Sequence, residues 1–192
     1  MRRFVVTSGA ILGLMWSTST SAQQPRRLDA SELRALEAQV ASAYAVATEA
    51  DFIETRGFSW SPVTWRGHAT LTKRGFVFDY AVPAGRRIVG DATTIRVLEP
   101  VGAPLRFESR VDRTASSAYA ALMLLSAAAP AFQFGQLAGD YEVMSAFGWF
   151  CIDARTSHVV RIDHRPNWEI QFTNIHAASS VAIAVVQAAL AP

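Results

Sequence analysis

Three side chains in the second half of the chain could carry covalent chemistry. Cys151, His158 and Asp163 are a thiol, an imidazole and a carboxylate, the set that activates a cysteine nucleophile when the three groups meet. Cys151 and His158 flank a predicted tight turn, however, and their spacing does not direct one toward the other. The sequence also lacks the G-x-S-x-G elbow of serine hydrolases. We therefore expect no enzyme, and an enzyme centred on Cys151 is the third of our hypotheses.

The single cysteine is more simply explained as a packing residue. It lies in the apolar run Trp149–Ile152, where a small side chain would fill a core, and one thiol cannot form an internal disulfide. The four histidines, His68, His158, His164 and His176, are too scattered to suggest a metal site. No glycine-rich phosphate loop follows any predicted strand. We expect no metal and no cofactor.

The start of the chain has the pattern of a secretory signal. Arg2 and Arg3 precede the apolar stretch Phe4–Trp16, and small residues suited to cleavage follow it. The apolar stretch is short for a membrane-spanning helix. We predict that residues 1–22 are a signal peptide removed during export, that residues 23–192 form a single domain, and that the protein resides in the periplasm.

The charge balance argues against a nucleic-acid partner. The whole chain carries 18 Lys and Arg against 16 Asp and Glu. Arg2 and Arg3 would leave with the signal, so the basic and acidic residues of the mature chain would be equal in number. A neutral protein without a basic stripe lacks the electrostatic attraction on which binding to nucleic acid depends.

The strongest structural signal is an aromatic strand near the middle of the chain. Phe76, Phe78 and Tyr80 recur at period two, so they share one face of a strand that Pro83 and Gly85 end. Such a stripe is most simply part of an ordinary core. Because it follows an export signal and precedes a very apolar helix, we favour a sharper interpretation, a hydrophobic pocket for a lipid.

Two helices are predicted on either side of this strand region. The first is capped by Asp29 or Ser31, and apolar residues recur at helical spacing over 33–47. The second, 118–128, has almost no polar face, so it must be covered on more than one side or lie across an apolar opening. The tail, 181–190, could form a closing helix or a strand.

From Phe52 the pattern changes to period two, and such patterns predict the strands that surround these helices. They are 58–60 with 63–65, 68–72, the stripe itself, 87–89, 94–99, 105–111, 140–146, 149–153, 158–163 and 168–172. Leu105, Phe107 and Val111 alternate with charged residues, which is typical of an antiparallel strand with one wet face. We therefore predict an α+β fold in which one curved antiparallel sheet carries helices on its concave apolar face.

The order of these motifs resembles the LolA family of periplasmic lipoprotein carriers, over most of Leu33 to Ile175. The matching segments are Phe52-Ile53-Glu54-Thr55 for the family's F-x-Q-T, Lys73-Arg74 for Lys-Arg-Pro, Phe76 to Pro83 for F-x-W-x-Y-x-x-P, Val89-Gly90-Asp91 for V-x-D-G, Thr94 to Pro100 for T-x-W-x-Y-x-P, Ala121 to Ser126 for a leucine-rich helix, Phe150 to Arg161 for F-x-x-D-x-x-T-x-x-V-x-R, and Ile170 to Asn174 for a late strand. Glu54 stands where the family has Gln, and the proline after Arg74 is missing.

The resemblance implies an unclosed antiparallel half-barrel with a helical lid over its apolar face. The protein would be a monomeric chaperone that binds the acyl chains of lipoproteins and carries them from the inner to the outer membrane. Its partners would be acylated lipoproteins, an inner-membrane lipoprotein-releasing ABC transporter and an outer-membrane lipoprotein receptor. Arg74 matches the arginine that holds the lid near the sheet in the family. The acyl-chain cavity would be lined by Phe76, Phe78, Tyr80, Phe107, Leu122 and Leu125.

A second hypothesis keeps this fold and changes its role. The protein would be a sensor or scaffold that carries another lipid, or that binds a protein partner at the wet face or the edge of its sheet. It predicts a stable protein partner without bound acyl chains. The sequence leaves the cargo open among a lipoprotein, a glycolipid and a fatty acid.

Overall fold

The computed structural model describes most of the chain after the predicted signal. The described residues are 25–57, 61–82, 84–91, 94–98, 106–108, 131–146, 148–164 and 168–191. The predicted signal peptide, the predicted helix 118–128 and, with it, Leu122 and Leu125 lie outside these ranges.

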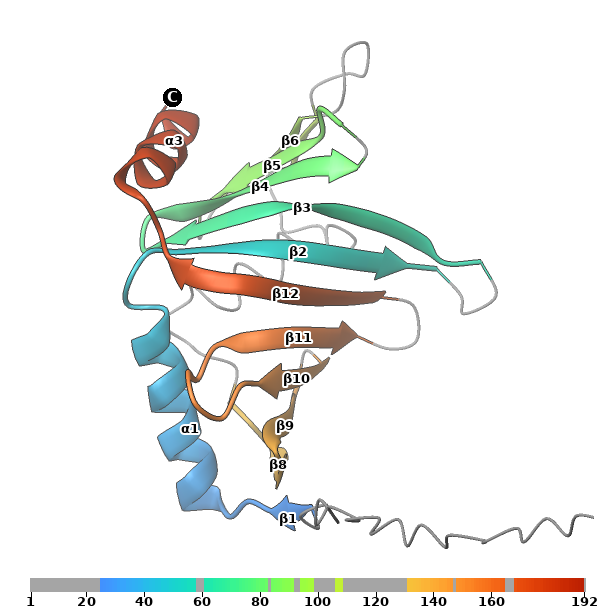
Figure 1. The fold of residues 1–192 in the computed structure, drawn as a ribbon, viewed down its shortest axis with the longest axis vertical. Helices are drawn as coiled ribbons and strands as arrows, with labels where there is room; N and C mark the ends of the chain where they lie inside the picture. Colours follow the sequence, from blue (N-terminus) through green and yellow to red (C-terminus); the bar gives the residue numbers. More distant parts are fainter. Residues whose placement is uncertain are drawn as a thin grey trace, which may run out of the picture.

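One antiparallel sheet of twelve strands forms the body of the described structure (Figure 1). The strand order is β1-β8-β9-β10-β11-β12-β2-β3-β4-β5-β6-β7, and β1 and β7 are its two edges, so the sheet does not close. The strands are β1 Arg26–Arg27, β2 Thr48–Arg56, β3 Val63–Thr72, β4 Gly75–Val82, β5 Arg87–Gly90, β6 Ile95–Leu98, β7 Arg106–Glu108, β8 Phe134–Ala138, β9 Asp140–Ser145, β10 Gly148–Ile152, β11 Val159–His164 and β12 Trp168–Ala177.

Helix α1, Ala30–Ala43, begins where the sequence predicts. The Asp29 side chain accepts hydrogen bonds from the backbone N–H groups of Ser31 and Glu32, and the Glu32 side chain accepts one from the Asp29 N–H, which is a capping box. The apolar positions Leu33, Leu36 and Val40 recur at helical spacing and are buried. Both the start and the buried face of this helix are therefore local properties of its sequence.

The larger hydrophobic core lies on one face of the sheet, which we call the inner face. Strands β2 to β6 and β9 to β12 contribute alternating residues to it, and α1 with its C-cap contributes Leu33, Leu36, Val40 and Tyr44. Tyr44 contacts β11, because its hydroxyl accepts a hydrogen bond from the Val159 N–H at 3.2 Å. Glu37 accepts one from the Phe132 N–H, directly before β8, at 2.6 Å. Helix α1 thus lies over the β8–β11 part of the inner face.

The predicted tail is a helix, α3, Ser180–Leu190, and it packs on the opposite face of the sheet, which we call the outer face. Val186 of α3 is buried against Val77 of β4 and Val89 of β5. The prediction that helices cover the inner face therefore applies to α1 and not to α3. The physical reason is that β4 is apolar on both sides, since Val77 alternates with Phe76 and Phe78, so both faces need a covering layer.

The central strands are longer than the sequence patterns suggested. Two predicted segments, 63–65 and 68–72, form the single strand β3, which continues through Gly67. A Cβ atom at Gly67 would lie 2.1 Å from the Asp79 carbonyl oxygen and 2.7 Å from the Phe52 ring, so the missing side chain makes room for that ring. Strands β1 and β8 and the first half of β2 were not predicted, because small and charged residues obscure the alternation there.

Among the described helices, none is long and apolar enough to cross a membrane. The predicted fold class is confirmed: the sheet is antiparallel and unclosed, and a helix packs against its apolar inner face.

Candidate functional site

Four aromatic rings from β2 and β4 form a continuous row on the inner face, which we call the aromatic row. Ring centroids are 5.0 Å apart for Tyr80 and Phe52, 5.2 Å for Phe52 and Phe78, and 5.9 Å for Phe78 and Phe76, all edge to face. Ile88 extends the row toward β5. Of the two described helices, α1 lies over β8–β11 and α3 on the outer face. Neither of these helices lies over the row, whose four rings are each at most 4% exposed.

Three of the predicted cavity residues belong to this row. Phe76 and Phe78 are 0% exposed and Tyr80 is 4% exposed, on the same face of β4, as the period-two pattern predicts. Of Phe107 the structure describes the backbone, which lies in β7 opposite Arg96. Arg74 is exposed in the turn between β3 and β4, and its predicted contact with a lid stays a prediction, because the predicted lid helix lies outside the described residues.

A charged cluster, which we call the Glu54 cluster, lies at one end of the aromatic row. The Glu54 carboxylate is fully buried. It accepts hydrogen bonds from the Tyr80 hydroxyl at 2.7 Å, the Trp168 indole N–H at 2.8 Å and the Arg56 Nε–H at 2.7 Å. Each donor comes from a different strand, β4, β12 and β2, so the cluster ties three strands together on the inner face.

Two arginines stack on the aromatic rings of the same cluster. The Arg56 guanidinium lies 4.5 Å from the Trp65 ring centroid, and that of Arg86 lies 5.2 Å from the centroids of both Trp65 and Tyr80. The cluster occupies the end of the sheet where β2 and β4 finish and β3 and β12 begin, on the right in Figure 1. The inner face is thus apolar along its length and charged at one end.

The sequence analysis did not identify the Glu54 cluster, although one signal for it was present. Phe52, Glu54 and Arg56 alternate along one strand, so a carboxylate and a guanidinium had to share the face of a buried phenylalanine. The contributions of Trp65, Arg86 and Trp168 could not be read in this way, because they reach the cluster from other strands.

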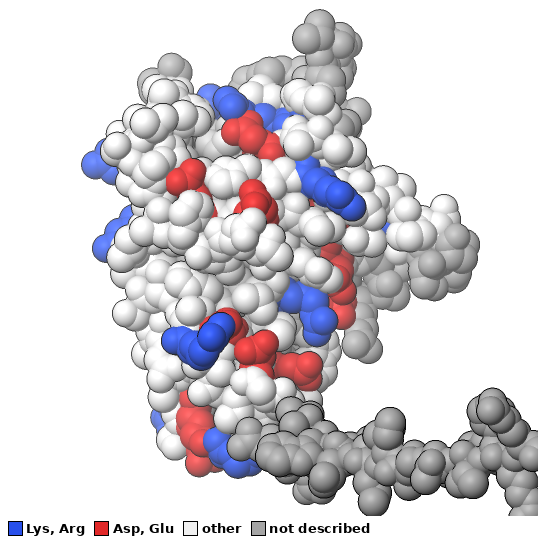
Figure 2. Space-filling view, in the orientation of Figure 1, with Lys and Arg blue, Asp and Glu red and all other residues white. Residues whose placement is uncertain are grey.

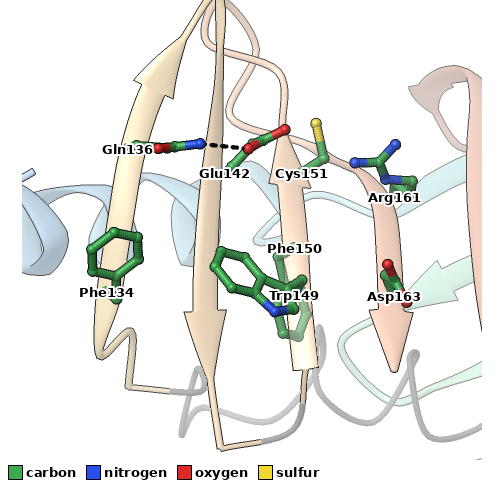
Figure 3. Close-up of a pocket in the computed structure, with 8 residues that line it drawn as sticks. All are labelled: Phe134, Gln136, Glu142, Trp149, Phe150, Cys151, Arg161 and Asp163. Atoms are coloured by element: carbon green, nitrogen blue, oxygen red, sulfur yellow. Dashed lines mark hydrogen bonds between the residues drawn. The ribbon is translucent and has the colours of Figure 1, made fainter. Parts of the chain in front are cut away.

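A separate cavity of about 200 Å³ lies on the outer face of β8 to β11 (Figure 3). It is lined by Phe134, Gln136, Glu142, Trp149, Phe150, Cys151, Arg161 and Asp163. Cys151 is half-buried there, on the side of the sheet opposite the main core, so it is not the core residue that its apolar neighbours suggested. Burial and the nearby Asp140 carboxylate raise the pKa of its thiol, which disfavours the thiolate that a nucleophile needs.

The structure does not assemble the three residues considered for covalent catalysis. Cys151 and Asp163 line the outer cavity, whereas the His158 ring packs edge to face on Tyr44 at 5.4 Å. Burial lowers the pKa of His158. Within the described ranges, no group of three or more His, Cys, Asp or Glu side chains could hold a metal ion.

The face seen in Figure 2 carries basic and acidic side chains interspersed over its surface. They do not gather there into one large patch of a single sign. The described face therefore offers no basic stripe of the kind that nucleic-acid binding requires.

No family model and no curated protein sequence matches this chain, but solved structures do. A DUF1329 family protein from Desulfovibrio piger is 9% identical, with a TM-score of 0.51 over 84% of this chain and 99% of that chain. A LolA superfamily protein from Nitrosomonas europaea is 7% identical, with a TM-score of 0.44 over 77% and 94%. A Vibrio parahaemolyticus domain, described as an outer membrane lipoprotein-sorting protein, is 9% identical, with a TM-score of 0.44 over 79% and 94%.

At these identities the likeness concerns the fold. The Desulfovibrio piger protein shares it over almost its whole length.

Proposed function

We propose that this protein is a periplasmic carrier that binds the acyl chains of lipoproteins on its inner face and moves them from the inner to the outer membrane. The observation that supports this proposal most directly is the aromatic row, Phe52, Phe76 and Phe78, on one face of an unclosed antiparallel sheet. Two of the motifs that resemble the LolA family, those that begin at Phe52 and at Phe76, lie on the same strands. In this proposal an inner-membrane transporter supplies the cargo and an outer-membrane receptor accepts it, without any enzymatic step.

The driving force for uptake would be the hydrophobic effect. Each methylene group withdrawn from water contributes about 0.8 kcal/mol, so an acyl chain laid along the aromatic row would bind tightly. A carrier must also release its cargo. A lid with an open and a closed state would offset part of this gain, because part of the binding free energy is used to shift the lid between the two states. The lid would close over the cargo and open at the receptor. The predicted helix 118–128 and Arg74 are the proposed parts of that lid.

A release assay tests the proposal. Purified protein, residues 23–192, is added to spheroplasts that display a triacylated lipoprotein on the inner membrane. We expect the lipoprotein to appear in the soluble fraction in a complex with the protein. If no lipoprotein is released by the folded protein, the lipoprotein-carrier proposal is wrong. Lipid extraction from natively purified protein would then separate another lipid cargo from the protein-binding scaffold.

Phe78→Asp is the variant that connects this activity to the aromatic row. A carboxylate at a fully buried inner-face position should remove acyl binding, because an ionised group there opposes apolar contact. Val181→Asp on α3, the helix that packs on the outer face, is the control, since Val181 is 72% exposed. Circular dichroism must show both variants folded. Release by folded Phe78→Asp at the wild-type level would contradict the proposed binding surface.

A further inference from the structure

The cavity on the outer face of β8 to β11 has no part in the proposed carrier function. It lies on the side of the sheet opposite the aromatic row and has a volume of about 200 Å³ (Figure 3). Pockets for drug-sized ligands measure about 300–1,000 Å³, so this cavity suits a smaller molecule. Its lining combines two half-buried aromatic rings with charged groups of both signs, which a simple packing gap does not require.

A carboxylate and a guanidinium line this cavity on either side of a small residue. Glu142 of β9 and Arg161 of β11 each lie opposite Cys151 of β10, and Figure 3 shows their side chains on opposite sides of the thiol. Neighbouring strands are about 4.8 Å apart, so the backbones of β9 and β11 are about 10 Å apart. Within the described residues neither charged group forms an ion pair, and Arg161 is exposed. Opposite charges therefore face one open space without neutralising each other directly.

The Glu142 side of the cavity is arranged to accept hydrogen bonds. The Gln136 Nε2 group donates to the Glu142 carboxylate at 2.8 Å, which holds the carboxylate in place. The Gln136 carbonyl oxygen is then a further acceptor beside it. An ammonium group has three donors and no acceptor, so this pair of side chains suits it. The Arg161 guanidinium has donors only and suits a carboxylate, which it can bind through two parallel hydrogen bonds.

Two aromatic rings form the adjoining wall of the cavity. The ring centroids of Phe134 and Trp149 are 6.3 Å apart, edge to face. Both residues are half-buried, unlike the rings of the aromatic row, so part of their surface is accessible to a ligand. Trp149 lies two residues from Cys151 on the same face of β10, which is about 7 Å along the strand. One small molecule can therefore place an apolar group on the rings and its charged groups beside Cys151.

We propose that the outer cavity binds a small zwitterion, an α-amino acid with an apolar or aromatic side chain. The carboxylate of the ligand lies at the Arg161 guanidinium, its ammonium group lies at Glu142 and Gln136, and its side chain packs on the rings. Asp163 is a second carboxylate in the lining, so a ligand that is only an anion is disfavoured. A ligand that is only a cation is disfavoured by Arg161. This inference does not depend on the proposed carrier function, because the two sites lie on opposite faces of the sheet.

Isothermal titration with three compounds that share one phenyl ring tests the inference. L-phenylalanine carries both charges, 3-phenylpropanoate lacks the ammonium group, and 2-phenylethylamine lacks the carboxylate. All three are titrated into the folded protein at pH 7.5. We expect L-phenylalanine to bind about tenfold more tightly than either analogue, because each missing charge leaves one charged side chain of the site without its partner.

Two variants should distinguish the two charged ends of the site. Arg161→Gln should lower the affinity for L-phenylalanine and 3-phenylpropanoate about tenfold and should not weaken the binding of 2-phenylethylamine. Glu142→Gln should weaken L-phenylalanine and 2-phenylethylamine by a similar factor and spare 3-phenylpropanoate. General damage to the fold would weaken all three ligands together, so this crossed pattern reports the proposed contacts. Arg155→Gln is a matched control, because Arg155 is 90% exposed in the β10–β11 turn and does not line the cavity.

The outcomes decide this inference separately from the proposed function. Equal affinity for the three compounds, or tighter binding of either analogue, would overturn the zwitterion site. A preference for L-phenylalanine that survives in both folded variants would overturn its location. If the folded protein bound none of the three, the inference would fail, and the release assay would still decide the carrier proposal.

Discussion

A single residue, Glu54, changes the character of the inner face. Its carboxylate has no exposure to solvent and is surrounded by three hydrogen-bond donors. A buried carboxylate persists only when its partners compensate for lost hydration. The Arg56 guanidinium supplies the compensating charge, and the Tyr80 hydroxyl and the Trp168 indole satisfy further lone pairs. The stability of the strands around Glu54 therefore depends on Arg56.

The first prediction concerns this ion pair. Arg56→Gln should lower the free energy of unfolding by about 3 kcal/mol, because it leaves the Glu54 charge buried without its countercharge. Adding Glu54→Gln to that variant should recover part of the loss, since no charge then remains to be compensated. Urea unfolding midpoints of the single and double variants measure the coupling.

Arg155→Gln is the control for this comparison. The Arg155 side chain is 90% exposed and lies 3.8 Å from Asp153, so its loss should change the free energy of unfolding by less than about 0.5 kcal/mol. An unfolding midpoint of Arg56→Gln equal to that of Arg155→Gln would show that the buried pair does not stabilise the protein.

At the scale of elements, helix α3 is held to the outer face by a small apolar contact and a charged junction. Glu49 of β2 accepts a hydrogen bond from the Ser179 N–H at 2.8 Å, at the residue that caps α3. His68 lies between two carboxylates, with its Nε2 3.1 Å from Glu49 and its Nδ1 3.1 Å from Asp51. Asp51 also accepts a hydrogen bond from Asn174 at 2.7 Å. Protonated His68 can donate to both carboxylates and so supports the docking of α3.

Each titrating group of this junction has a shifted pKa. Burial by itself lowers the pKa of His68, but its hydrogen bonds to Asp51 and Glu49 outweigh burial and raise the pKa above the ordinary value. The pKa of Glu49 is lowered, first by the Ser179 N–H, and that of Asp51 is lowered, first by the Asn174 amide. Two further titratable groups lie nearby. Asp79 is opposite His68 on β4 and forms an ion pair with Arg87, and His176 forms a hydrogen bond with the Glu49 carbonyl oxygen.

The second prediction follows from the signs of these shifts. The raised pKa of His68 means that protonated His68 stabilises the folded protein. This stabilisation is fully present below pH 6.5, the ordinary pKa of histidine, and is lost as the pH rises through the raised pKa. The lowered carboxylate pKa values add stability that is present above their ordinary values, 4.5 and 3.8, and is lost at lower pH. Docking of α3 should therefore be strongest between these limits, in mildly acidic solution.

Hydrogen-exchange protection factors of the α3 amides at several pH values measure this effect. They should fall by up to about fivefold as pH rises past the His68 titration, a change below about 1 kcal/mol that suits partly exposed pairs. His68→Gln should remove this dependence, and His158→Gln should leave it unchanged. Protection of α3 that rises toward alkaline pH would contradict the role given to His68.

At the scale of the whole molecule, one sheet serves two cores. The larger core on the inner face joins α1 to β2–β6 and β8–β12, and the smaller one on the outer face joins α3 to β4 and β5. The aromatic row belongs to the larger core, where its four rings are each at most 4% exposed.

The third prediction concerns the export of the whole chain. Intact-mass measurement of the protein from a periplasmic extract, under denaturing conditions, should give the mass of residues 23–192. The basic start and the short apolar stretch are the reason, since signal peptidase removes such segments during secretion. A mass that includes residues 1–22, or recovery only from the cytoplasm, would contradict export by a cleaved signal.

The sequence by itself determined those features that depend on local periodicity and local capping. Asp29 and Glu32 define the start of α1, and the period-two pattern of Phe76, Phe78 and Tyr80 defines the apolar side of β4. Side chains alternate across a strand whatever its neighbours are, so this inference needs no tertiary contact. The period-two patterns predicted one curved antiparallel sheet, and the resemblance to the LolA family implied that this sheet is unclosed.

Only the tertiary structure decided which distant residues meet. Trp168 and Tyr80 reach Glu54 because β12 and β4 flank the β2–β3 pair. Cys151 faces the outer cavity because of the register between β9, β10 and β11. The face on which α3 packs depends in the same way on Val77 and Val89 lying side by side. Sequence spacing carries no information on strand neighbours or register, since hydrogen bonds between strands form across long stretches of chain.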